Sequence, residues 1–264
     1  MFFEILTAEQ VFPKLRVSGF RSGDAIIRQK GGVYSRIGKW EKFEPIMPGE
    51  QYNPNAGGLA KIMAGFQIGA VTHSFGDKPL LLERPKEVSS VLLLEMDHKG
   101  EIVEIHLNDS MGEETNEKLG KILVRPGGFF AASWASVLFG LTPIKNPQTA
   151  SALAGSFGIK DGYQMAMQSF RARIKGKTTS GILFLESIGR CQRILLKKGE
   201  EYVVAPDKVF ALSYNVEITL RGNSTFPGGE ADGGWYDTVL KVKDKYPGEY
   251  GVIWLDDGCK RIVR

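Results

Sequence analysis

The sequence predicts an all-β fold in which short-stranded β-sandwich units repeat three times with pseudo-threefold symmetry. The chain of 264 residues contains 32 glycines and 12 prolines, which favours many short strands joined by tight turns. A glycine-turn segment occurs three times, at Ile27–Ser35, Val124–Ala131 and Val204–Ala211. An apolar run that ends in an acid recurs in step with it, at Val91–Glu95, Ile182–Glu186 and Val252–Asp256. Such a unit usually cannot bury its apolar face alone, so the stacked units form the core.

One domain is expected over residues 1–264, with repeats at about 20–110, 111–198 and 199–264, because no linker or low-complexity segment divides the chain. Hydrophobic residues make up 42% and charged residues 24%, which is typical of a soluble globular protein. The formal net charge of +4 is compatible with plain solubility and is only weak evidence for an anionic partner.

The strands are predicted from residue type and alternation. Residues Ile102–Leu107 alternate between apolar and polar side chains, so one face of this strand is expected to be buried. Tyr202–Val204, Val209–Leu212 and Val216–Leu220 are rich in β-branched and aromatic residues, which favour strands.

Turns are expected between these strands. Pro126–Gly128 and Pro206–Lys208 place a proline next to residues that tolerate tight turns. Hairpins are predicted at Asp97–Gly100, Ile188–Gly189 and Asp257–Gly258, because each of these segments follows an apolar run.

Between the strands lie inserts that differ from repeat to repeat. Gly57–Gly76 and Thr149–Phe170 are apolar and rich in glycine and alanine, whereas Gly222–Trp235 is shorter and more polar. Helical turns are predicted at Leu59–Ala64 and Ala150–Ala154, and the glycines make longer helices unfavourable.

The uncharged segment Pro126–Ile144 is long enough to cross a bilayer. It begins with Pro-Gly-Gly, it closes with Thr-Pro next to Ile144, and its first half matches the other two repeats. We therefore predict a buried strand followed by an apolar loop in place of a membrane span.

The apolar inserts must be covered, by another subunit or a partner, by the protein's own core, or by a membrane surface. Methionine side chains adapt readily to such contacts. The candidate contact residues are Leu59, Ile62, Met63, Phe66, Leu138, Phe139, Phe157 and Met165.

A basic segment offers a second candidate surface. Read as a strand, Phe170–Lys177 places its four cations on one face. These candidate anion-binding residues are Arg171, Arg173, Lys175 and Lys177. The row could bind RNA phosphates or anionic lipid headgroups, or it could be a solvated strand edge that prevents aggregation. The cationic face carries no aromatic residue for base stacking, which makes nucleic acid an unfavoured partner.

The recurring turn segments resemble the AIM24 family (altered inheritance of mitochondria protein 24). That family repeats glycine-turn modules of the Leu-Val-x-Pro-Gly-x-Phe-x-Ala kind, to which Leu123–Ala131 is similar. Gly181–Ala211, centred on Gly199–Val204, resembles the module that follows. The resemblance extends from about Gly23 to the C-terminus and is best from Leu119 onward.

This resemblance implies a fold similar to that of the tryptophan-RNA-binding attenuation protein (TRAP-like), with double-stranded β-helix-like sandwich units about a pseudo-threefold axis. It also implies a non-enzymatic role, which in mitochondrial members is linked to inner-membrane organisation. The family offers no catalytic motif, so no site residue is transferred from it.

Residues for catalysis are scarce in the sequence. The three histidines, His73, His98 and His106, lack the close pair with a following glutamate that a cupin metal site shows. Cys191 and Cys259 are expected on equivalent strands and not in a disulfide, which fits a reducing compartment. The sequence therefore predicts no catalytic residue, no metal site and no cofactor.

The acids that end the apolar runs are candidates for equivalent positions near the axis or along one rim. These acids are Glu95, Glu186 and Asp256. The plainer interpretation is a strand-end carboxylate paired with a nearby cation, for example Arg190 or Arg193 for Glu186.

Together these observations predict a non-enzymatic scaffold or assembly protein that self-associates, or docks on a larger and possibly membrane-associated complex, through its apolar inserts. The alternative is an RNA- or anionic-lipid-binding module that uses the basic strand face. A cytoplasmic location is expected, because Met1–Gly19 resembles neither a signal peptide nor a transit peptide, and a mitochondrial one if a transit peptide has been removed.

Overall fold

The computed structural model confirms the all-β class. It describes residues 1–8, 11–21, 24–28, 33–40, 43–45, 80–83, 89–108, 120–133, 136–156, 166–172, 181–222, 236–246 and 248–257. In this part of the chain, nineteen strands are accompanied by one α-helix and one short 3₁₀ helix. No helix among the described residues has both the length and the apolar character needed to cross a membrane.

The strands form four antiparallel sheets, and the first of them contains the N-terminus. In order across this sheet, its strands are β1 (Phe2–Ala8), β2 (Val11–Ser18), β7 (Val91–Glu95) and β4 (Val33–Ile37).

Two six-stranded sheets form the middle of the molecule. The first has the order β5 (Phe43–Pro45), β6 (Leu80–Glu83), β3 (Ala25–Arg28), β10 (Phe129–Ser133), β13 (Gly181–Ser187) and β8 (Glu101–Leu107). The second has the order β11 (Val137–Pro143), β12 (Ala166–Ala172), β9 (Lys121–Val124), β16 (Val209–Ser213), β19 (Tyr250–Asp256) and β14 (Cys191–Lys197).

A three-stranded sheet completes the fold. Its order is β15 (Glu201–Val204), β18 (Tyr236–Val242) and β17 (Val216–Gly222). The 3₁₀ helix η1 (Pro206–Lys208) joins β15 to β16 at a predicted turn. The helix α2 (Pro147–Ser156) includes the predicted helical turn, and the amide groups of Gln148 and Thr149 donate to the Asn146 side chain at its start.

The two six-stranded sheets correspond strand for strand. Each is joined at its centre by three residue pairs, between β3 and β10 in one sheet and between β9 and β16 in the other. Both also carry an irregularity at the same place, between Phe129 and Ala131 in β10 and between Val209 and Ala211 in β16. The threefold axis itself stays a prediction.

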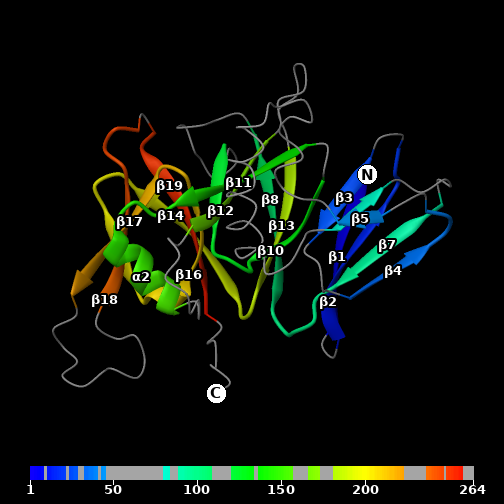
Figure 1. The fold of residues 1–264 in the computed structure, drawn as a ribbon, viewed down its shortest axis with the longest axis horizontal. Helices are drawn as coiled ribbons and strands as arrows, with labels where there is room; N and C mark the ends of the chain where they lie inside the picture. Colours follow the sequence, from blue (N-terminus) through cyan, green and yellow to red (C-terminus); the bar gives the residue numbers. More distant parts are fainter. Residues whose placement is uncertain are drawn as a thin grey trace, which may run out of the picture.

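The two outer sheets correspond to the two halves of such a sheet. The order β2-β7-β4 matches β8-β13-β10, and the order β15-β18-β17 matches β9-β12-β11. Figure 1 shows the four-stranded sheet, with β4 and β7, at one end of the longest axis and β17 and β18 at the other end.

The hairpins predicted at Asp97–Gly100 and Ile188–Gly189 are wrong. β7 and β8 flank the first segment but belong to different sheets, and the same holds for β13 and β14 around the second. β8 instead forms seven residue pairs with β13, and β14 forms seven with β19. The apolar strands β13 and β19 are buried, so they need a partner on each side, and a long-range strand supplies it. The third predicted hairpin, Asp257–Gly258, lies partly outside the described residues.

The core consists of three main apolar clusters. The central cluster holds Phe129, Phe139 and Phe170 in mutual ring contact, with centroid distances of 5.3 to 5.6 Å. Phe139 and Phe170 come from the antiparallel strands β11 and β12, so the segment predicted as an apolar loop after Pro126 contains a strand that contributes to the core.

Candidate interaction sites

A buried ion pair lies where the second six-stranded sheet joins its two halves. Arg125 follows β9 and Asp256 ends β19, and Nη2 of Arg125 lies 2.5 Å from Oδ2 of Asp256. The two side chains are 4% and 0% exposed. The carboxylate also accepts hydrogen bonds from the backbone amides of Ile188, at 2.9 Å, and Gly189, at 2.8 Å. Asp256 is therefore a structural carboxylate whose hydrogen-bonding capacity is used inside the fold.

The corresponding position in the first six-stranded sheet is Glu186. The pKa of Glu186 is raised to about 7: burial is the largest cause, and the Asp97 carboxylate adds to it, whereas His98 and Arg28 act in the opposite direction. The charged groups that act on Glu186 thus differ from Arg190 and Arg193, the partners suggested by the sequence. Arg28 is itself buried, and burial lowers the pKa of its guanidinium.

Glu186 predicts a specific pH dependence of stability. Its folded-state pKa of about 7 lies above the ordinary value of 4.5, so the folded protein binds an extra proton between these values and loses stability as the pH rises through about 7. We expect Glu186→Gln to remove this loss, which is at most about 3 kcal/mol. Urea unfolding at about pH 5 and about pH 8 measures it for both proteins. An identical pH dependence in the two proteins would contradict the assignment.

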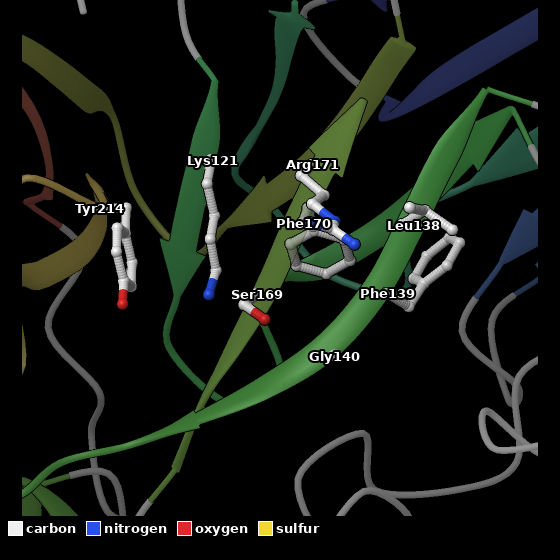
Figure 2. Close-up of a pocket in the computed structure, with 8 residues that line it drawn as sticks. All are labelled: Lys121, Leu138, Phe139, Gly140, Ser169, Phe170, Arg171 and Tyr214. Carbon is white, nitrogen blue, oxygen red and sulfur yellow. The ribbon is translucent and has the colours of Figure 1, made fainter. Parts of the chain in front are cut away.

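A basic cavity of about 240 Å³ opens beside the second sheet. It is lined by β9, β11, β12 and the turn after β16; the lining residues are Lys121, Leu138, Phe139, Gly140, Ser169, Phe170, Arg171 and Tyr214. Figure 2 shows the Lys121 side chain between Tyr214 and Ser169, with the Lys121 nitrogen and both hydroxyl oxygens directed to the same side. Lys121 and Arg171 stand directly opposite each other on β9 and β12.

Two contacts fix the Lys121 side chain. Its Nζ donates to Oγ1 of Thr142 at 3.1 Å and lies 4.2 Å from the centroid of the Tyr214 ring. Burial lowers the pKa of Lys121, and the positive charge of Arg171 lowers it further. Lys243 approaches the same ring, with its Nζ 4.4 Å from the centroid.

A larger cavity of about 580 Å³ shares Tyr214 with the first. Its apolar lining includes Leu123, Met167, Leu212 and Val216, and three lysines also line it. These lysines are Lys145, Lys243 and Lys245, and the acids Glu217 and Asp244 line it as well. The smaller, cationic cavity thus lies next to a larger one that has both an apolar wall and charged residues of either sign.

Each of the two outer sheets ends in a strand whose counterparts in the six-stranded sheets are paired on both sides. β4 pairs with β7 and β15 pairs with β18, and in the described part of the chain neither has a neighbour on its other side. The matching strands β10, β16, β3 and β9 are paired on both sides. Ile37 at the end of β4 is 58% exposed and Val203 in β15 is 44% exposed.

The predicted contact residues are only partly described. Phe139 is buried in the central cluster, so for this residue the protein's own core is the cover, one of the alternatives that the sequence left open. Leu138 is half-buried at the basic cavity, next to Arg171, which is exposed. The remaining candidates lie outside the described residues: Leu59, Ile62, Met63, Phe66, Phe157, Met165, Arg173, Lys175 and Lys177.

Groups for covalent or metal chemistry are not gathered in the described part of the chain. No cluster of three or more His, Cys, Asp or Glu side chains there could hold a metal ion. The Cys191 thiol has a pKa of about 12, raised first by burial and then by the Glu101 carboxylate, and such a thiol is a poor nucleophile at neutral pH.

Comparison with known proteins adds evidence on the fold. No family model matches the chain, and no curated protein matches its sequence. Among solved structures, the crystal structure of protein SPYM3_0169 from Streptococcus pyogenes is similar, with a TM-score of 0.55 and 14% sequence identity. The alignment covers 97% of this chain and 93% of that one. The two chains thus share a fold over nearly their whole lengths.

Proposed function

We propose that this protein is a non-enzymatic scaffold of the AIM24 type that associates with itself end to end. The observation that carries the proposal concerns the edges of β4 and β15 that have no neighbouring strand among the described residues: these two strands match the strands that join the halves of each six-stranded sheet. A β4 edge on one copy next to a β15 edge on another would join a four-stranded and a three-stranded outer sheet into one seven-stranded sheet, of which the six strands β2-β7-β4-β15-β18-β17 match the inner six-stranded sheets. Such a head-to-tail contact builds rings or filaments.

The inner joins give the expected register of this contact. In the second sheet Ala211, Leu212 and Ser213 of β16 oppose Val124, Leu123 and Ile122 of β9. The strand correspondence then places three residues of one copy opposite three of the next. The expected pairs are Ser35 with Val204, Arg36 with Val203, and Ile37 with Tyr202.

The chemistry of the two edges supports this register. Ile37 would be covered by Tyr202, and Arg36 would lie diagonal to Glu201 on the same face. The contact is short, and Arg125, which pairs with Asp256 at the inner join, corresponds to Ala205 at the outer one. We therefore expect association to be weaker than the inner joins and to depend on protein concentration.

Charge on either edge is expected to prevent assembly. Ile37→Asp and Val203→Asp each add an unpaired carboxylate at an exposed position, so folding should be unaffected while the strand contact is lost. Light scattering across a range of protein concentrations should show oligomers for the natural sequence and monomers for both variants. Leu195→Asp on β14, which is 38% exposed, is the matched control and should assemble normally.

Mixing the two variants distinguishes a head-to-tail contact from a symmetric one. The Ile37→Asp protein keeps a competent β15, and the Val203→Asp protein keeps a competent β4. An equimolar mixture should therefore form dimers and nothing larger. Unchanged oligomers in both variants, or a monomeric natural protein at every concentration, would refute the proposal.

The alternative, an RNA- or anionic-lipid-binding surface, rests on the row that begins at Arg171. Within the described chain, Arg171 is opposed by Lys121 and has Lys243 across Tyr214. Lys121 and Arg171 line the basic cavity and Lys243 lines the larger one, and cations around cavities favour a small anionic group over a polymer.

A further inference from the structure

We propose that the basic cavity beside β9, β11 and β12 binds the phosphate group of a phosphate monoester. Lys121 and Arg171 would supply the cations, Ser169 and Thr142 the hydroxyl groups, and the adjoining larger cavity the space for the ester substituent. This site is independent of the strand edges proposed above for self-association.

The first argument is uncompensated charge. Lys121 and Arg171 are a directly opposed cross-strand pair of like charge, an arrangement that destabilises a sheet. In the described part of the chain, no carboxylate lies within ion-pair distance of either of them. A bound dianion would convert this repulsion into two charge-assisted contacts.

The second argument is that Lys121 is held in place. Its hydrogen bond to Thr142 and its contact with the Tyr214 ring keep a half-buried ammonium group beside the hollow. A lysine on a free surface would extend into solvent and keep its mobility. The lowered pKa of Lys121 has the same origin, since burial and Arg171 both disfavour its charge, and a bound anion would reverse this effect.

The third argument is that a glycine keeps the hollow open. Gly140 lies opposite Ser169 on the face that carries Lys121 and Arg171. A Cβ atom at position 140 would lie 3.1 Å from Oγ of Ser169, which also lines the cavity. The backbone of Gly140 does not have a positive φ, so alanine could adopt the same conformation. Alanine at this position would therefore place a methyl group beside the Ser169 hydroxyl and narrow the cavity, with little change to the fold.

Size and polarity identify the ligand class. A cavity of about 240 Å³ suits a phosphate group and not a whole cofactor. The neighbouring cavity of about 580 Å³ has an apolar wall, which includes Leu123, Met167 and Leu212, and this wall would accept an apolar or aromatic substituent. A soluble phosphate monoester and the monoester headgroup of phosphatidic acid share this chemistry.

Calorimetry with phenyl phosphate and with inorganic phosphate tests the site on the full chain, and flotation with vesicles tests the lipid source. The vesicles are phosphatidylcholine with and without phosphatidic acid. We expect phenyl phosphate to bind more tightly than inorganic phosphate, and Lys121→Met and Gly140→Ala each to weaken binding at least about tenfold. Lys197→Met on the exposed strand β14 is the control and should bind normally.

The outcomes are distinct. Saturable phenyl phosphate binding that both variants weaken supports a soluble ligand. Flotation that needs phosphatidic acid and is lost in both variants, without phenyl phosphate binding, supports a lipid headgroup. The proposal is overturned if neither probe binds, or if binding is unchanged in Lys121→Met and in Gly140→Ala. Thermal unfolding of Gly140→Ala near that of the natural protein would show that the lost binding is not lost folding.

Discussion

Asp256→Ala is expected to lower the free energy of unfolding by about 3–5 kcal/mol, because it leaves a buried guanidinium without its counterion. The variant loses the 2.5 Å contact with Arg125 and also the acceptor for the amides of Ile188 and Gly189. Each orphaned amide adds a desolvation cost. Urea unfolding monitored by tryptophan fluorescence and circular dichroism measures the difference.

Two further variants make this result interpretable. Asp256→Asn keeps one acceptor oxygen and should lose less stability than the alanine variant, so it serves if the latter does not fold. Glu217→Ala breaks the exposed pair of Glu217 with Lys241, whose atoms are 3.2 Å apart, and should change the stability far less because solvent screens such a pair. A loss at Asp256 no larger than at Glu217 would mean that the buried pair contributes little.

Phe170→Ala is expected to cost about 3–5 kcal/mol through the cavity it leaves in the central cluster. The ring is fully buried, stacks on Phe129 at 5.3 Å and meets Phe139 edge-on at 5.5 Å. Phe170→Leu should cost less, since leucine fills most of the same volume. Chemical denaturation is again the measurement.

Phe2→Ala is the matched control for the core variant. Phe2 is 71% exposed, so its truncation should change the stability by less than about 0.5 kcal/mol. Equal losses at Phe2 and Phe170 would contradict the assignment of Phe170 to the core.

Much of the strand content could be predicted because local chemistry and burial agree. Val209–Leu212 is apolar, and it forms β16, whose residues are all buried. Ile102–Leu107 forms β8 as predicted, with Ile105 and Leu107 buried in the central cluster. Ile102 is buried in another cluster on the opposite face of β8, so the expected single buried face is only part of the result. In such segments apolar composition is enough to predict a strand, whereas the faces that are buried depend on the neighbouring sheets.

Strand pairing was less predictable because it depends on competition between distant segments. The turn after Val91–Glu95 has hairpin chemistry, yet β7 pairs with β2 and β4 and never with β8. Turn-forming residues predict that the chain changes direction, but they do not predict whether the two flanking strands pair with each other. The apolar loop expected after Pro126 became strand β11 for the same reason, since β12 was available to pair with it.

The basic cavity could be found in the sequence only in part. Arg171 was a candidate because it begins a row of cations. Lys121 stands fifty positions earlier at the start of an apolar run and faces Arg171 only through the register of β9 with β12. Tyr214 and Gly140 have no local pattern that marks them, and the sheet alone brings them to one place.

The six-stranded sheets combine strands from distant parts of the chain, which has a consequence for folding during synthesis on the ribosome. β3 is complete at residue 28, but its neighbour β10 begins at residue 129, and β13, which completes β10, begins at residue 181. The pairing of β3 with β10 therefore closes a loop of about a hundred residues, and such long-range pairing slows folding. At ordinary elongation rates of roughly 5–20 residues per second, the edge of β3 that later pairs with β10 therefore stays unpaired for seconds during synthesis. The sequence repeats are thus not autonomous folding units. A fragment cut at the repeat boundaries would contain strands, such as β3, whose pairing partner belongs to another repeat.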